Sequence, residues 1–562
     1  MLPDGKMPNG SFFPARLSSL SWRDDPDYSV TPQLWGFQHT NWFAIMAFLV
    51  VLLVFTTLGI SRYLFESQQR SAGLPPGPPG LPIIGNVLDA PTVYPWRVYH
   101  QWCKKYGPVF SLNMAGSRII MLGSHKAAND LLDKRSSIYS SRPQMVMASE
   151  CLGRGMLTLL MPYGDQWRAH QKLQMSCLNK RASTTYYELQ DLESKHLVHQ
   201  LLSTDNFSDC FRRYAASLVF SLAYGKRLPN IHEPELKELD EIVENTLTTL
   251  IPGAWLVDVL PFLNVLPKWL APWKKYAARL SNFESMVYGK NFASGLASPS
   301  WNWSKQVKTM SDGNMSHEEL TYDIGIMYEV SSDTTTIAFE VFTLAALLHP
   351  AAVKKAQAEL DRVMGPNRLP NFSDKDNLPY IHAFANEVLR WRPVAAGGVP
   401  HAVTEDDEYM GYRIPKGTTV IANHWAICHD ENVYEKPERF NPDRWIENPN
   451  LPLATFGHGR RACFGQHVAR NSMFIIIARL LWAFDIECPY EEKDGVKVRQ
   501  VPDPMAMTQG FNSKPMPFKA DFKPRTPSTA ATVRAEWDAQ EKDIDAILGR
   551  VQQAQAAQKG KA

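Results

Sequence analysis

The stretch "FGHGRRACFGQHVAR", from Phe456 to Arg470, decides how this sequence is interpreted. Cys463 is one of only seven cysteines in 562 residues, and the run that follows it, "VARNSMFIIIARLLWAF", is typical of a helix with an apolar side. Three glycines allow tight turns and the close approach of a flat ligand. A thiol before a helix and beside Arg460 and Arg461 is expected to have a depressed pKa, so the stretch predicts an ionised thiolate.

Three interpretations of Cys463 compete on these grounds. The first is an inert core cysteine. The second is a nucleophile, which requires a nearby base, and His458 and His467 are the candidates. The third is a thiolate that serves as the axial ligand of haem iron. The residue types alone leave all three open.

The order Phe456-x-x-Gly459-x-Arg461-x-Cys463-x-Gly465 resembles the haem-binding signature of the cytochrome P-450 superfamily at every fixed position. The resemblance extends over most of residues 74–520. It implies that Cys463 ligates the iron of haem b (iron protoporphyrin IX) and that the other four residues surround this cofactor. It also implies a mainly α fold with small β-sheets, built as one large, triangular, helix-rich catalytic domain.

A second stretch, "NEVLRWRPV", places Glu387 and Arg390 on one face of a helix, where they can pair. A lone pair of this kind carries little information, because surface ion pairs share the spacing. Its position before "PERFNPDRW" resembles the family's buried Glu-Arg-Arg network, with Arg444 as the expected third member and Arg439 as the alternative. The implied role is structural, and removing one partner is expected to cost about 3–5 kcal/mol.

The stretch "YEVSSDTTTIAFEVFTLAALL" is apolar except for six polar residues in a row, 331–336. One explanation is that hydroxyls bond back to the carbonyls of their own helix. The family resemblance instead makes Asp333 and Thr334 an acid–alcohol pair that supplies the protons consumed when dioxygen is split. The family usually has Gly at Ser331 and Ala or Gly at Val330, so the local helix distortion that makes room for oxygen must arise by other means.

Two further stretches resemble sites that bind the haem propionates. Trp167, in "YGDQWRAHQKL", matches the family, but Gln171 stands where an Arg is usual, with Arg168 or Lys172 as compensating cations. His401, in "GGVPHAVTEDD", matches a position that often donates to a propionate, and it is expected to act together with Arg461. The alternative for His401 is an ordinary surface histidine.

The resemblance implies monooxygenation, in which one oxygen atom enters a C–H bond or double bond and the other becomes water. The chain shows no GxGxxG opening a βαβ unit and no flavin domain, so the electrons of NADPH must come through an external donor. The expected donor is NADPH–cytochrome P-450 reductase, docking near Arg460 and Arg470. The net charge of +2 gives no indication of a nucleic-acid partner.

The expected substrate is a small apolar or aromatic molecule, because the segments that the resemblance assigns to the pocket are rich in small and apolar residues. The predicted lining residues are Met327, Val330, Val394, Ala395, Ala396, Gly397, Met505 and Met507. Residues 394–445 look most like fungal secondary-metabolism members, including those that hydroxylate phenolic polyketides such as cresols. A haem-thiolate isomerase or dehydratase that does not use oxygen, or a non-catalytic haem-binding membrane protein, are the alternatives. An acid–alcohol pair in a buried helix argues against both.

The stretch "WFAIMAFLVVLLVFTTLGI", Trp42 to Ile60, contains no charge and is just long enough to span a bilayer. The basic residues Arg62 and Arg70 follow it and acidic residues precede it, which favours a cytosolic catalytic domain. The sequence therefore predicts a single-pass protein of the endoplasmic reticulum membrane. Asn9 is the sequon that would be glycosylated on the lumenal side.

The remaining organisation follows from composition. The predicted parts are a lumenal segment (1–40), a transmembrane anchor (41–64), a proline-rich hinge (65–86), the catalytic domain (87–520) and a C-terminal extension (521–562). In the extension, apolar residues at near-helical spacing predict an amphipathic helix. Short strands are expected at "RIIML" (118–122) and "TTVIAN" (418–423). An odd number of cysteines without any CxxC pair argues against disulfides.

Overall fold

The computed structural model falls into two compact units, 1–70 and 71–562. The structure describes residues 49–50, 52–54, 56–57, 73–251, 253–311, 313, 315–493 and 496–559. The few described residues of the first unit are helical, and the rest of the predicted anchor, together with Asn9, lies outside the described residues. Among the described residues, no single helix is long and apolar enough to cross a membrane. Only the pair α13 (His317–Leu348) and α14 (Pro350–Met364), which meet at 103°, passes that test.

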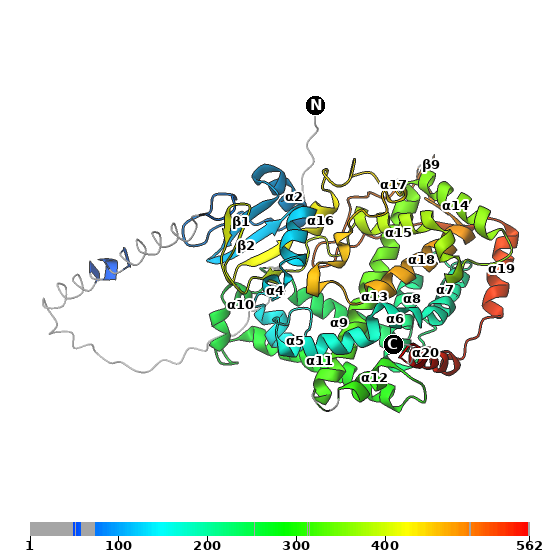
Figure 1. Ribbon diagram of the computed structural model, residues 1–562, viewed down its shortest axis with the longest axis horizontal. Helices are drawn as coiled ribbons and strands as arrows, with labels where there is room; N and C mark the ends of the chain where they lie inside the picture. The colour runs from blue at the N-terminus through cyan, green and yellow to red at the C-terminus, as the bar shows by residue number, and fades with distance from the viewer. Residues whose placement is uncertain are drawn as a thin grey trace, which may run out of the picture. The chain divides into compact units, whose positions relative to one another are not determined.

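Helices make up most of the second unit, as the resemblance implied (Figure 1). They are α2 (Pro95–Tyr106), α3 (His125–Ala128), α4 (Ser136–Tyr139), α5 (Asp165–Leu178), α6 (Lys180–Thr184), α7 (Tyr187–Gln200), α8 (Phe207–Tyr224), α9 (Pro234–Thr249), α10 (Leu256–Val259), α11 (Pro272–Ala297), α12 (Trp303–Met310), α13 (His317–Leu348), α14 (Pro350–Met364), α15 (Pro379–Trp391), α16 (His424–Cys428), α17 (Asp443–Glu447), α18 (Gln466–Ala483), α19 (Pro527–Asp538) and α20 (Ile544–Lys559). Short π or 3₁₀ segments are η1 (Asn129–Asp133), η2 (Val146–Leu152), η3 (Pro261–Val265), η4 (Phe372–Asn377), η5 (Ala454–Phe456) and η6 (Gly459–Arg461).

The strands form one four-stranded sheet and three two-stranded ones. They are β1 (Val109–Met114), β2 (Ser117–Leu122), β3 (His401–Ala402), β4 (Asp407–Tyr409), β5 (Tyr412–Ile414), β6 (Thr419–Ala422), β7 (Phe484–Glu487), β8 (Tyr490–Lys493), β9 (Val496–Arg499) and β10 (Asp521–Pro524). The larger sheet has the order β1-β2-β6-β3, in which β2 and β6 run parallel. Both predicted strands, 118–122 and 418–423, are therefore confirmed, and they lie side by side.

The long helix α13 lies at the centre of the helical region and packs against α8, α11, α15 and α18. Its start is fixed by a capping box, in which the Ser316 side chain accepts from the Glu319 amide while the Glu319 carboxylate accepts from the Ser316 amide. It ends at Leu348, because Pro350 opens α14 with no amide proton to give. Most of its side chains are buried.

The proline-rich segment after residue 73 packs along β1. The Ser111 amide donates to the Pro76 carbonyl at 2.8 Å, and a Cβ on Gly77 would lie 2.0 Å from the Ser111 carbonyl oxygen. Only glycine fits at this distance. This part of the predicted hinge thus contacts the catalytic unit closely.

The C-terminal extension adds β10 to β7 and then forms two helices, α19 and α20, where the sequence predicted one. The helix is interrupted at Asp543, which acts as the N-cap of α20. Its carboxylate accepts a hydrogen bond from the amide of Asp545. The Trp537 ring stacks on His196 of α7 with centroids 4.5 Å apart, and Ile547 is fully buried. The two helices lie at the end of the unit opposite the β1–β2 sheet (Figure 1).

Candidate active site

The loop that carries Cys463 lies between η5 and α18, and it is closed by its own backbone. The Cys463 amide donates to the Phe456 carbonyl at 2.7 Å, and Gly459 adopts a φ of 54°. A Cβ on Gly459 would lie 2.1 Å from the Leu132 carbonyl oxygen, so glycine lets the loop approach η1. The Asp133 carboxylate then accepts from the Gly459 amide at 2.5 Å. All seven cysteines of the chain are free, as predicted.

The pKa of the Cys463 thiol is raised, and the predicted depression is wrong. Its side chain borders open space, but the surrounding protein keeps it from bulk water, and this burial outweighs the amides of Gly465 and Gln466, which donate to the sulfur and lower the pKa. The two neighbouring arginines do not compensate. Arg461 donates to carbonyls elsewhere, and Arg460 donates to the Tyr163 hydroxyl at 2.6 Å.

The buried guanidinium of Arg142 and the partly buried one of Arg461 lie close together near this loop. Arg461 donates to the carbonyls of Ser140 and Met161, each at 2.7 Å, and its charge centre lies 4.1 Å from the Trp167 ring centroid. Arg142 donates to the Leu159 carbonyl at 2.9 Å. Among the described residues, neither arginine has a carboxylate partner. Burial lowers the pKa of Arg461 to about 9, and burial together with the charge of Arg461 lowers the pKa of Arg142.

His401 lies beside the same two cations. Its Nδ1 is 2.7 Å from the Tyr139 carbonyl and must carry the proton, because a carbonyl only accepts. Burial, and then the charge of Arg142, lowers the pKa of His401. This histidine is 5% exposed, which excludes the surface alternative. The structure thus brings Arg461, Trp167 and His401 together, and it adds Arg142, which the sequence analysis missed.

Neither Arg168 nor Lys172 replaces the arginine that the family usually has at the position of Gln171. Gln171 donates to the Arg460 carbonyl at 3.5 Å, which is a long contact. Arg168 is exposed and pairs with Asp165. Lys172 is also exposed. The buried charge comes instead from Arg142, whose partners belong to other parts of the chain, so no local pattern marks it.

Glu387 lies at the centre of a buried ionic network. Its carboxylate accepts from Nε and Nη2 of Arg390, each at 2.8 Å, and from Nε of Arg444 at 3.2 Å. Trp445 donates a further hydrogen bond at 2.9 Å. Arg439, the alternative third member, contributes only its carbonyl oxygen, which accepts from Arg390 at 3.2 Å. The geometry therefore favours Arg444 over Arg439, and every lone pair of the buried carboxylate has a donor nearby.

One face of α13 borders open space although most of the helix is buried. Val330 is 42% exposed, and Asp333 and Thr334 are partly exposed. The Thr334 hydroxyl donates to the Val330 carbonyl at 2.8 Å, which is the back-bonding that the sequence analysis held as an alternative. The helix runs unbroken through this turn, so the expected distortion is not visible.

Asp333 is held by a residue that the sequence analysis missed. The Asn512 amide nitrogen donates to its carboxylate at 2.6 Å. Burial raises the pKa of Asp333, and the Asn512 donor partly offsets this rise. Asn512 lies five residues after Met507, which the resemblance placed at the pocket.

The predicted lining residues do not all face the same way. Met327, Val394 and Ala396 are buried, whereas Ala395 and Gly397 are partly exposed like Val330. Met505 lies against Arg392, whose Nη2 is 3.4 Å from its sulfur, and Met507 is buried in the main core. Phe511, further along the chain, packs instead against a buried cluster that includes Ile326 of α13. The segment with Phe511 and Asn512 thus reaches α13.

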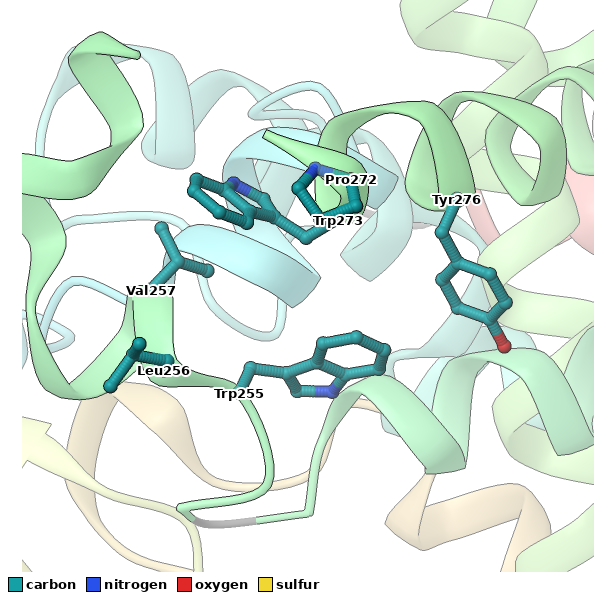
Figure 2. A pocket seen from close by; sticks show the side chains of 6 residues that line it. All are labelled: Trp255, Leu256, Val257, Pro272, Trp273 and Tyr276. Carbon is teal, nitrogen blue, oxygen red and sulfur yellow. The ribbon is translucent and has the colours of Figure 1, made fainter. Parts of the chain in front are cut away.

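A separate apolar pocket of about 350 Å³ lies between α10 and the start of α11. It is lined by Trp255, Leu256, Val257, Pro272, Trp273 and Tyr276, and Figure 2 shows the two tryptophans and the tyrosine around it. The Trp255 and Tyr276 rings stack with centroids 5.5 Å apart. Among these six residues there is no ionisable group other than the phenol of Tyr276, so the pocket suits apolar contacts and carries no chemistry of its own.

Comparison with known proteins agrees with this site. The chain is 44% identical to the cytochrome P450 monooxygenase aneD of Aspergillus aculeatus, over 90% of this chain and 98% of that protein. It is 43% identical to FrzL of Cladobotryum, with the same coverage, and 42% identical to the Echilunin cytochrome P450 monooxygenase of Aspergillus ruber, over 87% and 91%.

A solved zebrafish cytochrome P450, in a structure with abiraterone, matches 77% of this chain and all of its own with a TM-score of 0.63. At 23% identity this match shows the fold alone. The family model described as Cytochrome P450 matches residues 75–509, which include the cysteine loop, the Glu387 network and the open face of α13. The chain therefore belongs to the cytochrome P450 family and is a monooxygenase of that family.

Proposed function

We propose that this monooxygenase hydroxylates a small apolar or aromatic molecule, such as a phenolic polyketide, in fungal secondary metabolism. The electrons come from NADPH through an external cytochrome P450 reductase. The observation that carries the proposal is the open face of α13, where an exposed Val330 lies one turn from Asp333. The relatives named above are fungal monooxygenases, which supports the setting.

The residues around Cys463 fit a haem. The thiol has two amide donors that favour its ionised form. Arg142 is a buried cation and Arg461 a partly buried one, and neither has a carboxylate partner among the described residues. Two propionates would neutralise these cations, and His401 would add a donor through Nε2 once protonated. Bound haem would supply a thiolate-ligated iron that activates dioxygen.

The chain's own part in the reaction is to deliver protons and to exclude charge from the pocket. Asp333 reaches the open face of α13 and can hold a proton, because burial raises its pKa. Thr334 can relay that proton when its hydroxyl leaves the Val330 carbonyl. Val330, Ala395 and Gly397 offer no charge to the pocket, which suits an apolar substrate.

We also propose that the chain is anchored in the endoplasmic reticulum membrane by residues 41–64, with the catalytic unit in the cytosol. The uncharged run 42–60 supports an anchor. Large apolar side chains are also exposed on the catalytic unit after α10, including Val265 at 85% and Trp269 at 80%. Exposed apolar clusters of this kind mark interaction surfaces, and a lipid bilayer is a partner whose apolar interior would cover them.

The first test of the proposal is the spectrum of the dithionite-reduced protein with carbon monoxide. A strongly red-shifted Soret band is expected, and Cys463→Ser should lose it. A band where histidine-ligated haem absorbs, or a purified protein without haem, would remove Cys463 from its role. A panel of phenolic and terpenoid compounds, incubated with NADPH, reductase and the parent protein, then identifies the substrate class by its oxidised products.

A further inference from the structure

Two carboxyl groups that the proposed function does not use are buried near each other where α11 packs on α13. Glu284 is 1% exposed and Glu329 is 4% exposed. The Tyr322 hydroxyl donates to Glu284 at 2.6 Å, and the Tyr288 hydroxyl donates to Glu329 at 2.7 Å. Among the described residues, neither carboxyl has an ion-pair partner within 4.0 Å. We refer to Glu284 and Glu329 as the carboxyl pair.

The helix crossing that holds this pair is tightly built. A Cβ on Gly325 would lie 2.4 Å from the Tyr288 ring, so glycine lets that ring pass across α13. The rings of Tyr288 and Tyr322 meet edge to face with centroids 5.3 Å apart. The two phenols are therefore fixed in position as hydroxyl donors, and the carboxyl groups are fixed with them.

Burial raises the pKa of Glu284 to about 7. Burial, and then the charge of Glu284, raises the pKa of Glu329 to about 8. Two adjacent carboxyl groups with such values hold one shared proton near neutral pH, because they repel each other when both are ionised. The other groups that shift the pKa values of the pair are Thr246, Asp333, Arg154 and the two tyrosines.

A path leads from the pair to the open face of α13. Glu329 precedes Asp333 by four residues, so both lie on one face of the helix, within about 6 Å at Cβ. On the other side, the Thr246 hydroxyl of α9 donates to Glu284 at 3.4 Å and is close enough to Glu329 to lower the pKa of that carboxyl group. The charge of Arg154 lowers the pKa of Glu284, and Arg154 is exposed. Solvent therefore approaches Glu284 from the side of Arg154.

We propose that the carboxyl pair is a proton reservoir that recharges Asp333 during turnover. This inference rests on the proposed role of Asp333. Glu329 gives its proton to the Asp333 carboxylate, directly or through one water, which leaves both members of the pair ionised. Because two ionised carboxylates repel each other, Glu284 takes a proton from solvent on the Arg154 side and passes it to Glu329 through the Thr246 hydroxyl. No electron moves, and one solvent proton enters for each proton delivered.

The variants Glu329→Gln and Glu284→Gln test the reservoir, because glutamine keeps the shape and cannot give up a proton. Glu340→Gln is the matched control, since Glu340 is buried on the same helix, accepts from a hydroxyl of Ser208 and has a raised pKa, but has no contact with the pair. All variants are studied as purified haem-containing protein.

The first readout needs no turnover: infrared difference spectra follow the carbonyl stretch of protonated carboxyl groups against pH. The parent should lose a band over roughly pH 7–8, where the pKa values of the pair lie. In Glu284→Gln the midpoint for Glu329 should fall, because the repulsion is gone, and Glu340→Gln should leave it unchanged. An unchanged midpoint in Glu284→Gln would show that no proton is shared and overturn the proposal.

The second readout uses NADPH, reductase and oxygen without added substrate. Glu329→Gln should slow NADPH oxidation about tenfold, enlarge its solvent deuterium isotope effect and send more electrons into hydrogen peroxide, because general acids of this kind contribute at least that much. Glu340→Gln should match the parent. Equal behaviour of the two variants contradicts the reservoir, whereas a parent without the thiolate spectrum contradicts the proposed function itself.

Discussion

The amide of Asn512 donates to the carboxylate of Asp333 across 2.6 Å, although 179 residues separate the two in sequence. The Asn512 Oδ1 atom is buried and has no partner among the described residues. Rotation of the Asn512 side-chain amide by half a turn exchanges its N–H donor for its oxygen acceptor. Asn512 can therefore donate to Asp333 when that carboxyl group is ionised and accept from it when it is protonated. Asn512 thus positions the carboxyl group without fixing its charge.

Replacing Asn512 with Leu should raise the pKa of Asp333, because the lost N–H favours the ionised form. A hydrogen bond of this kind is worth about 1 kcal/mol, which corresponds to about a fivefold change in the proton equilibrium. The pH profile of NADPH oxidation should move upward, and peroxide release should grow. Gln509→Ala is the control, since Gln509 accepts from the Tyr94 amide and does not touch Asp333. Identical profiles for both variants would contradict this role.

Replacing Glu387 with Gln should cost about 3–5 kcal/mol of unfolding free energy, because two buried guanidiniums lose their counter-charge. Denaturant unfolding of the haem-containing protein measures this cost. The exposed pair between Glu487 and Lys523 supplies the comparison, and Glu487→Gln should change stability by less than about 1 kcal/mol. A small effect at Glu387 would mean that the network is dispensable for folding.

Gly459→Ala and Gly457→Ala should differ although both glycines have positive φ values of 54° and 75°. Alanine at 459 costs about 1–2 kcal/mol for the left-handed backbone. Alanine at 457, where ψ is −165°, costs about 1–3 kcal/mol. Only the Cβ at 459 also meets a backbone oxygen, at 2.1 Å, whereas at 457 the nearest atom is 3.7 Å away. Gly459→Ala should therefore lose about a further 1–3 kcal/mol. Thermal unfolding and haem content measure the difference, and equal losses would disprove the clash.

Trp537→Ala should destabilise the catalytic unit by about 2 kcal/mol, because it removes a half-buried ring that stacks on His196. Burial lowers the pKa of His196 to about 3, so the stacked imidazole is neutral at working pH. Lys542, which lies over the other side of Trp537, is exposed, and Lys542→Ala should change stability by less than about 0.5 kcal/mol. The prediction would be wrong if hydrogen exchange showed lost protection only in α19 and α20 while the unfolding midpoint of the rest of the catalytic unit stayed unchanged.

The cysteine loop, the pairing of Glu387 with Arg390 and the two strands at 118–122 and 418–423 could be predicted, because each depends on residues that are close in sequence. Arg142 and Asn512 could not, since their partners come from segments that only the folded chain brings near. The signals they leave in sequence are single polar residues in loops, which are common everywhere.

The pKa of Cys463 shows a second limit of the sequence. Its neighbours Arg460 and Arg461 suggest a depressed value, but their guanidiniums turn toward the Tyr163 hydroxyl and the Ser140 carbonyl. A pKa depends on where charges lie in space and on how much water is excluded, and neither quantity is visible in residue order.

Trp537 of α19 covers part of α7 by stacking on His196, and Ile547 of α20 is buried. During synthesis, α7 leaves the ribosome long before α19 and α20 do, so this part of its surface stays exposed until they emerge. The catalytic unit consequently reaches its final form only after both helices have emerged. A ribosome that stalls before that point would hold a catalytic unit with an open flank, which is a natural target for chaperones.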